Sequence, residues 1–252
     1  MKLTIRGYEP LIIPKEAIVP MQGSFGGQTP YIAKVAARWK NKSYIEKKLP
    51  LKILCLESIY DRAITEDTYQ TYSDPMAGIG ISARIFGYHR LLALNDFDES
   101  CVRVLKANYK VRCVITQDDI LTMPLHAAGL VFLDFNDFTM KRCFEKYSDV
   151  MRRAFEVASK FLVINDCSLF YLRYGKVAFD VYSRMLGKKI TSVEDYFRAV
   201  ASWYKERGWY LVQASYFTET SFLLLSRKAS KLVLKQIRPE DIPSGMIKVE
   251  TD

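Results

Sequence analysis

The sequence lacks the features of membrane and secreted proteins. It has no run of the about 18 consecutive apolar residues that a membrane span requires. Its first residues carry charges at Lys2, Arg6 and Glu9 and have no secretory hydrophobic region. We therefore expect a cytoplasmic protein with no membrane partner.

Cysteine and histidine are scarce. The five cysteines are odd in number, lie far apart and form no Cys-x-x-Cys pair, and the two histidines, His89 and His126, stand in unrelated contexts. This pattern predicts neither a disulfide framework nor a metal site. A histidine-based catalytic triad is equally disfavoured. We expect the cysteines to be small buried apolar residues.

What is present is enough apolar sequence for a substantial core. The chain has 252 residues, of which 49% are hydrophobic, and a formal net charge of +9. A basic excess favours polyanions through counterion release, so nucleic acid is the expected partner. Many soluble proteins are basic for no specific purpose, and that alternative stays open. The sequence gives no indication of the oligomeric state.

The chain is organised around residues 73–96. Gly78 and Gly80 fall where a strand turns into a helix, and a second strand ends at Asp96. A complete G-x-G-x-x-G motif is missing, because Met76 precedes the turn and Ala83 follows it. Acids at both strand ends would repel a phosphate but attract a ribose diol or a cationic amino-acid group. The pattern thus favours a cofactor without phosphates.

Two runs carry a family resemblance. DPMAGIG (residues 74–80) and NDFDESCVRVLKANY (residues 95–109) resemble motifs I and II of class I S-adenosylmethionine-dependent methyltransferases. Within that superfamily they are most similar to the tRNA guanine-N methyltransferases, which share the Asn-Asp at the second strand's end and an Asn closing the next helix, here Asn108. The resemblance covers roughly residues 72–228.

The resemblance implies a fold and a cofactor. The expected fold is α/β and Rossmann-like, with three layers, a mostly parallel seven-stranded sheet and a C-terminal antiparallel hairpin formed by residues 209–217 and 221–227. The expected cofactor is S-adenosyl-L-methionine. In the family an acid after the third strand accepts from the adenine amino group, and Asp118 fits this role best, whereas Asp119 could equally cap a helix. The expected cofactor-binding residues are Asp74, Met76, Ala77, Gly78, Gly80, Asp96, Phe97, Asp118 and Asp119.

A second set of residues follows the buried strand that ends at Asp134. Open α/β sheets place their chemistry at the carboxyl ends of such strands. In amino-methylating relatives an Asp or Asn is followed there by proline and an aromatic, but here Phe135 replaces the proline. The side chain of Asp134 and the carbonyl of Phe135 could accept from a substrate amine, and Phe138 could stack on a base. The predicted catalytic residues are Asp134, Phe135, Asn136 and Phe138; the alternative is a strand end capped by Asn136 or Asp137.

Two basic surfaces are candidates for substrate binding. Residues 31–48 predict a helix with Lys34, Arg38, Lys40 and Lys42 on its polar face, which either grips phosphates or is simply solvated. A helix predicted over residues 169–186 carries Arg173 and Lys176 beside tyrosines.

The chain divides into three parts in this interpretation. Residues 1–66 form an N-terminal extension for substrate binding or capping, residues 67–229 the catalytic domain, and residues 230–252 a tail that is an arm or disordered. The predicted function is methylation of an exocyclic or ring nitrogen of a base in RNA or DNA, for example in tRNA modification or DNA methylation. The alternatives are a methyltransferase acting on a small molecule or a protein, and a non-catalytic binding module that retains the fold.

Overall fold

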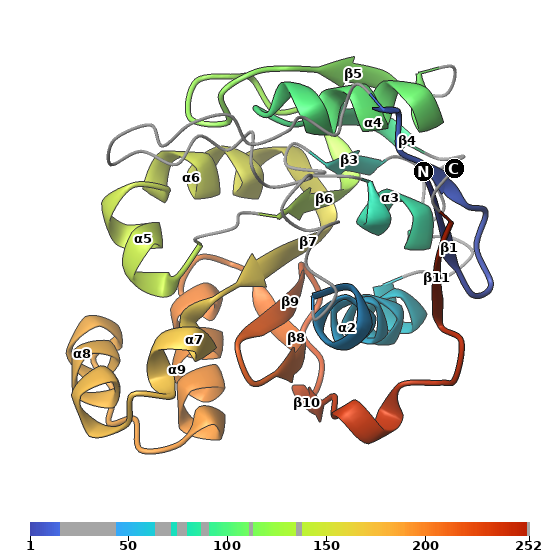
Figure 1. Cartoon of the computed structure of the whole chain (residues 1–252). Helices are drawn as coiled ribbons and strands as arrows, with labels where there is room; N and C mark the ends of the chain where they lie inside the picture. The colour runs from blue at the N-terminus through green and yellow to red at the C-terminus, as the bar shows by residue number, and fades with distance from the viewer. Residues whose placement is uncertain are drawn as a thin grey trace, which may run out of the picture.

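The computed structural model describes residues 1–15, 44–63, 72–74, 80–86, 91–110, 113–134 and 138–250 (Figure 1). Its larger sheet has eight strands in the order β10-β8-β9-β7-β6-β3-β4-β5. These strands are β3 (Tyr72–Asp74), β4 (Leu91–Asn95), β5 (Val114–Thr116), β6 (Ala128–Leu133), β7 (Ala158–Asp166), β8 (Tyr210–Phe217), β9 (Thr220–Ser226) and β10 (Val233–Gln236).

Within this sheet only the pairings made by β9 are antiparallel, and all other neighbouring strands are parallel. The predicted C-terminal hairpin is therefore β8 and β9, joined by a tight turn at Thr218 and Glu219. The α/β class is confirmed. The strand count differs from the expected seven because β10 adds a further edge strand beside β8.

Helices cover both faces of the sheet. The described α-helices are α2 (Leu49–Ala63), α3 (Ile81–Ile85), α4 (Glu99–Tyr109), α5 (Met140–Glu145), α6 (Ser148–Val157), α7 (Ser168–Leu172), α8 (Lys176–Leu186) and α9 (Val193–Lys205). Along β6, Leu130 and Phe132 pack in a core with α2, α3 and α4, whereas Val131 and Leu133 pack in a second core with α5, α6 and α9. Since successive strand residues face opposite sides, one strand serves both cores and the fold has three layers.

The N-terminal segments are attached to this framework. The first residues are extended: β1 (Lys2–Ile5) and β2 (Leu11–Ile12) form a small antiparallel sheet with β11 (Ile247–Glu250). The helix α2 packs against this framework as well. Gln213 of β8 donates to the carbonyl and to the hydroxyl of Ser58 at 3.0 and 2.8 Å, which fixes α2 on the main sheet.

The tail is ordered where the structure describes it. It contributes β10 to the main sheet, a 3₁₀ turn η4 (Pro239–Asp241), and β11, whose Val249 pairs with Leu3. It is thus an arm that joins both sheets, and the alternative of disorder is wrong for residues 230–250.

The helices that follow β6 and β7 are both interrupted. α5 and α6 are separated at Tyr147, which leaves helical geometry with its ring buried beside Phe138. Residues 169–186 form α7 and α8, separated at Gly175, whose φ of 75° and ψ of −143° are open essentially only to glycine.

The described part of the chain contains no helix that is both long and apolar enough to cross a membrane. Among these same residues, no group of three or more His, Cys, Asp or Glu side chains could hold a metal ion.

Candidate active site

The carboxyl ends of four adjacent parallel strands meet at one edge of the main sheet. In sheet order these strands are β5, β4, β3 and β6. They lead directly into Asp118, Asp96, the loop before Gly80, and Asp134. Because ligands of open α/β sheets bind at this edge, the topology brings the predicted cofactor and catalytic segments to one place.

Gly80 forms the end of the glycine turn. It has φ 77° and ψ 21°, a left-handed conformation, directly before α3. A Cβ placed here would lie 2.5 Å from Cε2 of Tyr109, the last residue of α4. The Tyr109 hydroxyl donates a 2.7 Å hydrogen bond to the Gly80 carbonyl. Gly80 thus meets a geometric need for glycine, and buried Tyr109 holds its carbonyl in place.

Of the other predicted residues of the turn, the structure describes Asp74 alone. Asp74 is the last residue of β3, so its backbone lies at the expected edge. Met76, Ala77 and Gly78 lie outside the described residues, and their predicted cofactor roles stay predictions.

Asp96 is held at the end of β4. It is nearly buried, and its Oδ1 accepts a 2.8 Å hydrogen bond from the backbone N–H of Asp98. Asp98 in turn caps α4 by accepting from the N–H of Ser100 at 2.8 Å. The carboxylate therefore has a fixed orientation, as a binding residue requires.

Asn95 connects this strand end to the segment after β5. Its Oδ1 accepts from the N–H of Asp118 at 2.9 Å, and its Nδ2 donates to the Asp118 carbonyl at 3.0 Å. The backbone of Asp118 is thereby fixed beside Asp96, while the Asp118 side chain is exposed. Phe97, also exposed (56%), lies on the same loop.

Asp119 has a local structural role. Its Oδ1 accepts from the N–H of Leu121 at 2.9 Å, and its carbonyl accepts from the N–H groups of Thr122 and Met123. This geometry is the turn-capping alternative that the sequence left open for Asp119.

Asp134 directly follows β6 and is held by the neighbouring strand. Asn165 of β7 donates from Nδ2 to Oδ1 of Asp134 at 2.5 Å. The Oδ1 of Asn165 accepts from the hydroxyl of Thr220, the first residue of β9, at 2.7 Å. Three strand ends therefore form one hydrogen-bonded chain that orients a half-buried carboxylate.

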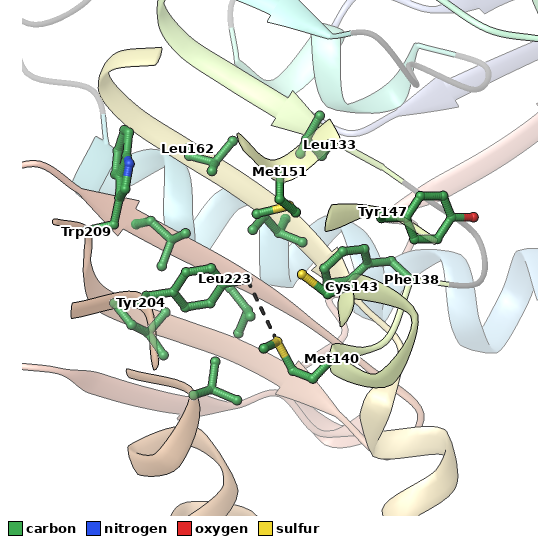
Figure 2. Close-up of a cluster of buried hydrophobic side chains, with 14 of the residues drawn as sticks. Leu133, Phe138, Met140, Cys143, Tyr147, Met151, Leu162, Tyr204, Trp209 and Leu223 are labelled. Carbon is green, nitrogen blue, oxygen red and sulfur yellow. Dashed lines mark hydrogen bonds between the residues drawn. The ribbon is translucent and has the colours of Figure 1, made fainter. Parts of the chain in front are cut away.

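The predicted role of Phe138 is wrong. Its side chain is fully buried and stacks on Tyr147 at a centroid distance of 6.0 Å (Figure 2). It precedes Thr139, the N-cap of α5, and shares a buried cluster with Cys143. A ring in this position packs as a hydrophobic staple and is not available to a substrate. The neighbouring candidates Phe135 and Asn136 lie outside the described residues.

A buried acid lies one residue beyond Asn165. Asp166 accepts from the hydroxyls of Ser168 and Tyr196, both at 2.6 Å. Burial raises the pKa of this carboxyl. These hydrogen bonds connect β7 to α7 and α9. Because Asp166 has no solvent exposure, it does not contact substrate.

Of the two predicted basic surfaces, the structure describes the one that contains Arg173 and Lys176. Lys34, Arg38, Lys40 and Lys42 lie outside the described residues. Arg173 follows α7, where its guanidinium lies 3.9 Å from the ring centre of Phe170 and 3.5 Å from the Glu219 carboxylate. Lys176 begins α8.

A cavity of about 450 Å³ lies between α5 and α8. Its lining includes Thr139, Arg142, Tyr171 and Tyr182. Burial raises the pKa of Tyr182 to about 12. Its lining residue Thr139 is close in sequence to the predicted catalytic residues.

Three residues of the site were not predicted: Tyr109, Asn165 and Thr220. The sequence carried a signal for Asn165, because the pair Asn165-Asp166 ends β7 as Asn95-Asp96 ends β4. The contacts of Tyr109 and Thr220 join segments far apart in the sequence, and no local pattern indicates them.

Comparisons with known proteins agree with this architecture. No family model and no curated protein matches the sequence. The structure is similar to that of magnesium protoporphyrin IX methyltransferase from Synechocystis PCC 6803 with bound SAH, with a TM-score of 0.53 and 10% identity over 78% of this chain and 95% of that chain. It is also similar to the plantazolicin methyltransferase BpumL in complex with SAH, with a TM-score of 0.51 and 12% identity over 80% of this chain and 92% of that chain. The chain has the fold that these methyltransferases share.

Proposed function

We propose that this protein is an S-adenosylmethionine-dependent methyltransferase that modifies a nitrogen of a base in nucleic acid, RNA in preference to DNA. The observation that carries the proposal is the sheet edge where a close glycine turn, the fixed carboxylate of Asp96 and the oriented carboxylate of Asp134 follow adjacent parallel strands. The methyltransferase fold of the chain supports the same reaction class.

The residues at this edge fit the cofactor. The turn ends at Gly80, where buried Tyr109 leaves no room for a Cβ. No cation stands among the predicted cofactor residues to hold a pyrophosphate. Asp96 would accept from the ribose diol, and Asp118 from the adenine amino group, with Asp119 left to its own turn. When bound, S-adenosylmethionine supplies an activated methyl group on its sulfonium.

Asp134 has the chemistry that an amine substrate needs. Nitrogen methylation forms an N–C bond, breaks the S–C bond and releases one proton from the amine. The hydrogen bond from Asn165 to Oδ1 fixes the orientation of the Asp134 carboxylate. A carboxylate has two oxygens, so Asp134 can still accept a hydrogen bond from the substrate amine. Asn136 and the carbonyl of Phe135 complete the predicted catalytic segment.

The choice of nucleic acid rests on charge and on sequence resemblance. The net charge of +9 favours a polyanionic substrate, and motifs I and II are most similar to those of tRNA guanine-N methyltransferases. A second candidate is a small-molecule substrate. The observation that favours it is the cavity of about 450 Å³ between α5 and α8, a size typical of small-molecule sites.

Methyl transfer from labelled S-adenosylmethionine tests both candidates. We expect label in RNA from a panel of tRNA, single-stranded RNA and DNA, and no label in RNA with Asp134→Ala. Transfer to a small-molecule extract but to no nucleic acid would identify the second candidate. A protein that binds the cofactor but labels none of these substrates would contradict the assignment as an enzyme.

A further inference from the structure

Three aromatic rings gather in five consecutive residues at the carboxyl end of β7. Phe170 contacts Tyr171 and Tyr174 edge to face, with centroid distances of 5.4 and 6.2 Å. Tyr174 is 64% exposed and Tyr171 is 49% exposed. Large rings at such exposure leave apolar area in water, so these faces are available to a planar ligand.

Basic groups stand around these rings. The guanidinium of Arg173 lies over the rings of Phe170 and Tyr174, at 3.9 and 5.2 Å from their centres, and Lys176 follows at the start of α8. Glu219 lies 3.5 Å from Arg173 and 2.5 Å from Lys48, so one acid is shared between two cations. The surface combines stacking faces with positive charge.

The surface is continuous with the cavity beside α5. Tyr171 lines that cavity together with Lys141, Arg142 and Tyr182. α5 follows the segment after Asp134, and α7 begins two residues after Asp166 of β7, so both helices start at the edge where Asp134 and Asn165 meet. In Figure 1, α5, α7 and α8 lie together on one side of the molecule.

We infer that this surface, named the α7–α8 surface and formed by Tyr171, Arg173, Tyr174 and Lys176 with the cavity residue Arg142, binds single-stranded RNA. Tyr171 and Tyr174 stack on unpaired bases, and the basic side chains contact the adjacent phosphates. Bases in a duplex are already stacked and paired, so exposed rings select unpaired nucleotides. The inference rests on the proposed function, because it names the form of nucleic acid that this site takes.

Fluorescence anisotropy with a labelled single-stranded RNA of about 12 nucleotides tests the aromatic contacts, since ssRNA-binding sites span about 4 to 16 nucleotides. We expect Tyr171→Ala and Tyr174→Ala each to weaken binding roughly 5- to 100-fold, the loss of one stacked base. Tyr171→Phe and Tyr174→Phe keep the ring and should bind like the intact protein. Val114→Ala, an exposed apolar side chain of the edge strand β5, is the control and should also bind like the intact protein.

Salt dependence tests the phosphate contacts. Arg142→Gln and Lys176→Gln should each lower the slope of log K against log salt by about 0.7. Lys106→Gln, an exposed lysine on α4, should leave the slope unchanged.

The outcomes separate this inference from the proposed function. If the intact protein binds single-stranded RNA but the Ala variants bind it equally well, or if a duplex of the same sequence binds as tightly, the inference is overturned while the methyltransferase assignment stands. Absence of any RNA binding at low salt overturns it as well. Calorimetry with S-adenosylhomocysteine on the same samples reports on the proposed function alone, because the variants leave the glycine turn intact.

Discussion

Replacing Gly80 by alanine tests the structure of the glycine turn with a magnitude that the geometry supplies. The new Cβ would meet Tyr109 at 2.5 Å and Leu105 at 3.1 Å, in a fully buried setting. A left-handed backbone costs a non-glycine residue about 1 to 2 kcal/mol. Overpacking a closed site adds about 1 to 3 kcal/mol. We expect Gly80→Ala to lower the free energy of unfolding by about 2 to 5 kcal/mol.

Gly187 provides a matched control. It has φ 62° and ψ 23° at the end of α8, nearly the same backbone conformation as Gly80, but nothing lies within 4 Å of its hypothetical Cβ. Gly187→Ala should therefore cost only the backbone strain of about 1 to 2 kcal/mol. The difference between the two variants isolates the contact with Tyr109.

Urea denaturation followed by tryptophan fluorescence measures both variants. The same samples should be titrated with S-adenosylhomocysteine, whose affinity should fall in Gly80→Ala and stay unchanged in Gly187→Ala. Equal losses of stability in the two variants would refute the claim that Tyr109 closes on the turn.

Three further predictions follow from the described contacts. Asp134→Asn keeps the shape of the side chain but loses its charge, so methyl transfer should fall roughly 100-fold or more while calorimetry shows cofactor affinity within a few fold; normal transfer would remove Asp134 from the chemistry. Arg84→Met removes a buried donor to the carbonyl of Pro10, so the free energy of unfolding measured by urea denaturation should fall by about 1 to 3 kcal/mol. Arg103 is exposed, so Arg103→Met should change this free energy by less than about 1 kcal/mol. Burial raises the pKa of the Cys143 thiol from 9.0 to about 12. Because the unfolded chain loses this proton at lower pH than the folded protein does, the free energy of unfolding should fall as pH rises from 9 toward 12. Urea denaturation at pH 8 and 10.5 should show a smaller fall in Cys143→Ala than in the intact protein, and an equal fall in both would contradict the prediction.

The parts of the site that depend on local chemistry could be predicted from the sequence. Asp98 caps α4 because a carboxylate two residues before Ser100 can reach its N–H without help from the rest of the fold. Gly80 adopts the left-handed conformation that its place before a helix suggested. The parallel pairing of β3 to β7 also agrees with the mostly parallel sheet that was expected.

What could not be predicted depends on contacts between distant segments. β10 is short and mostly exposed, and only its pairing with β8 makes it a strand. Asn108 was identified as the end of a helix, but its side chain also pairs with both backbone groups of Ile12 and so holds the edge strand β2. Phe138 was wrongly assigned to substrate stacking, because the sequence does not show that its ring is buried against Tyr147. Its place directly before the N-cap Thr139 was, however, a local signal for a hydrophobic staple.

Calorimetric titration with S-adenosylmethionine and S-adenosylhomocysteine measures the cofactor binding on which the proposed function depends. We expect saturable binding to the intact protein. We expect affinity to fall about tenfold to over a hundredfold in Asp96→Ala, which removes a charged acceptor, and to fall less in Asp96→Asn, which can still accept from the N–H of Asp98. Absence of binding by the intact, folded protein, or unchanged affinity in Asp96→Ala, would contradict the proposed cofactor site.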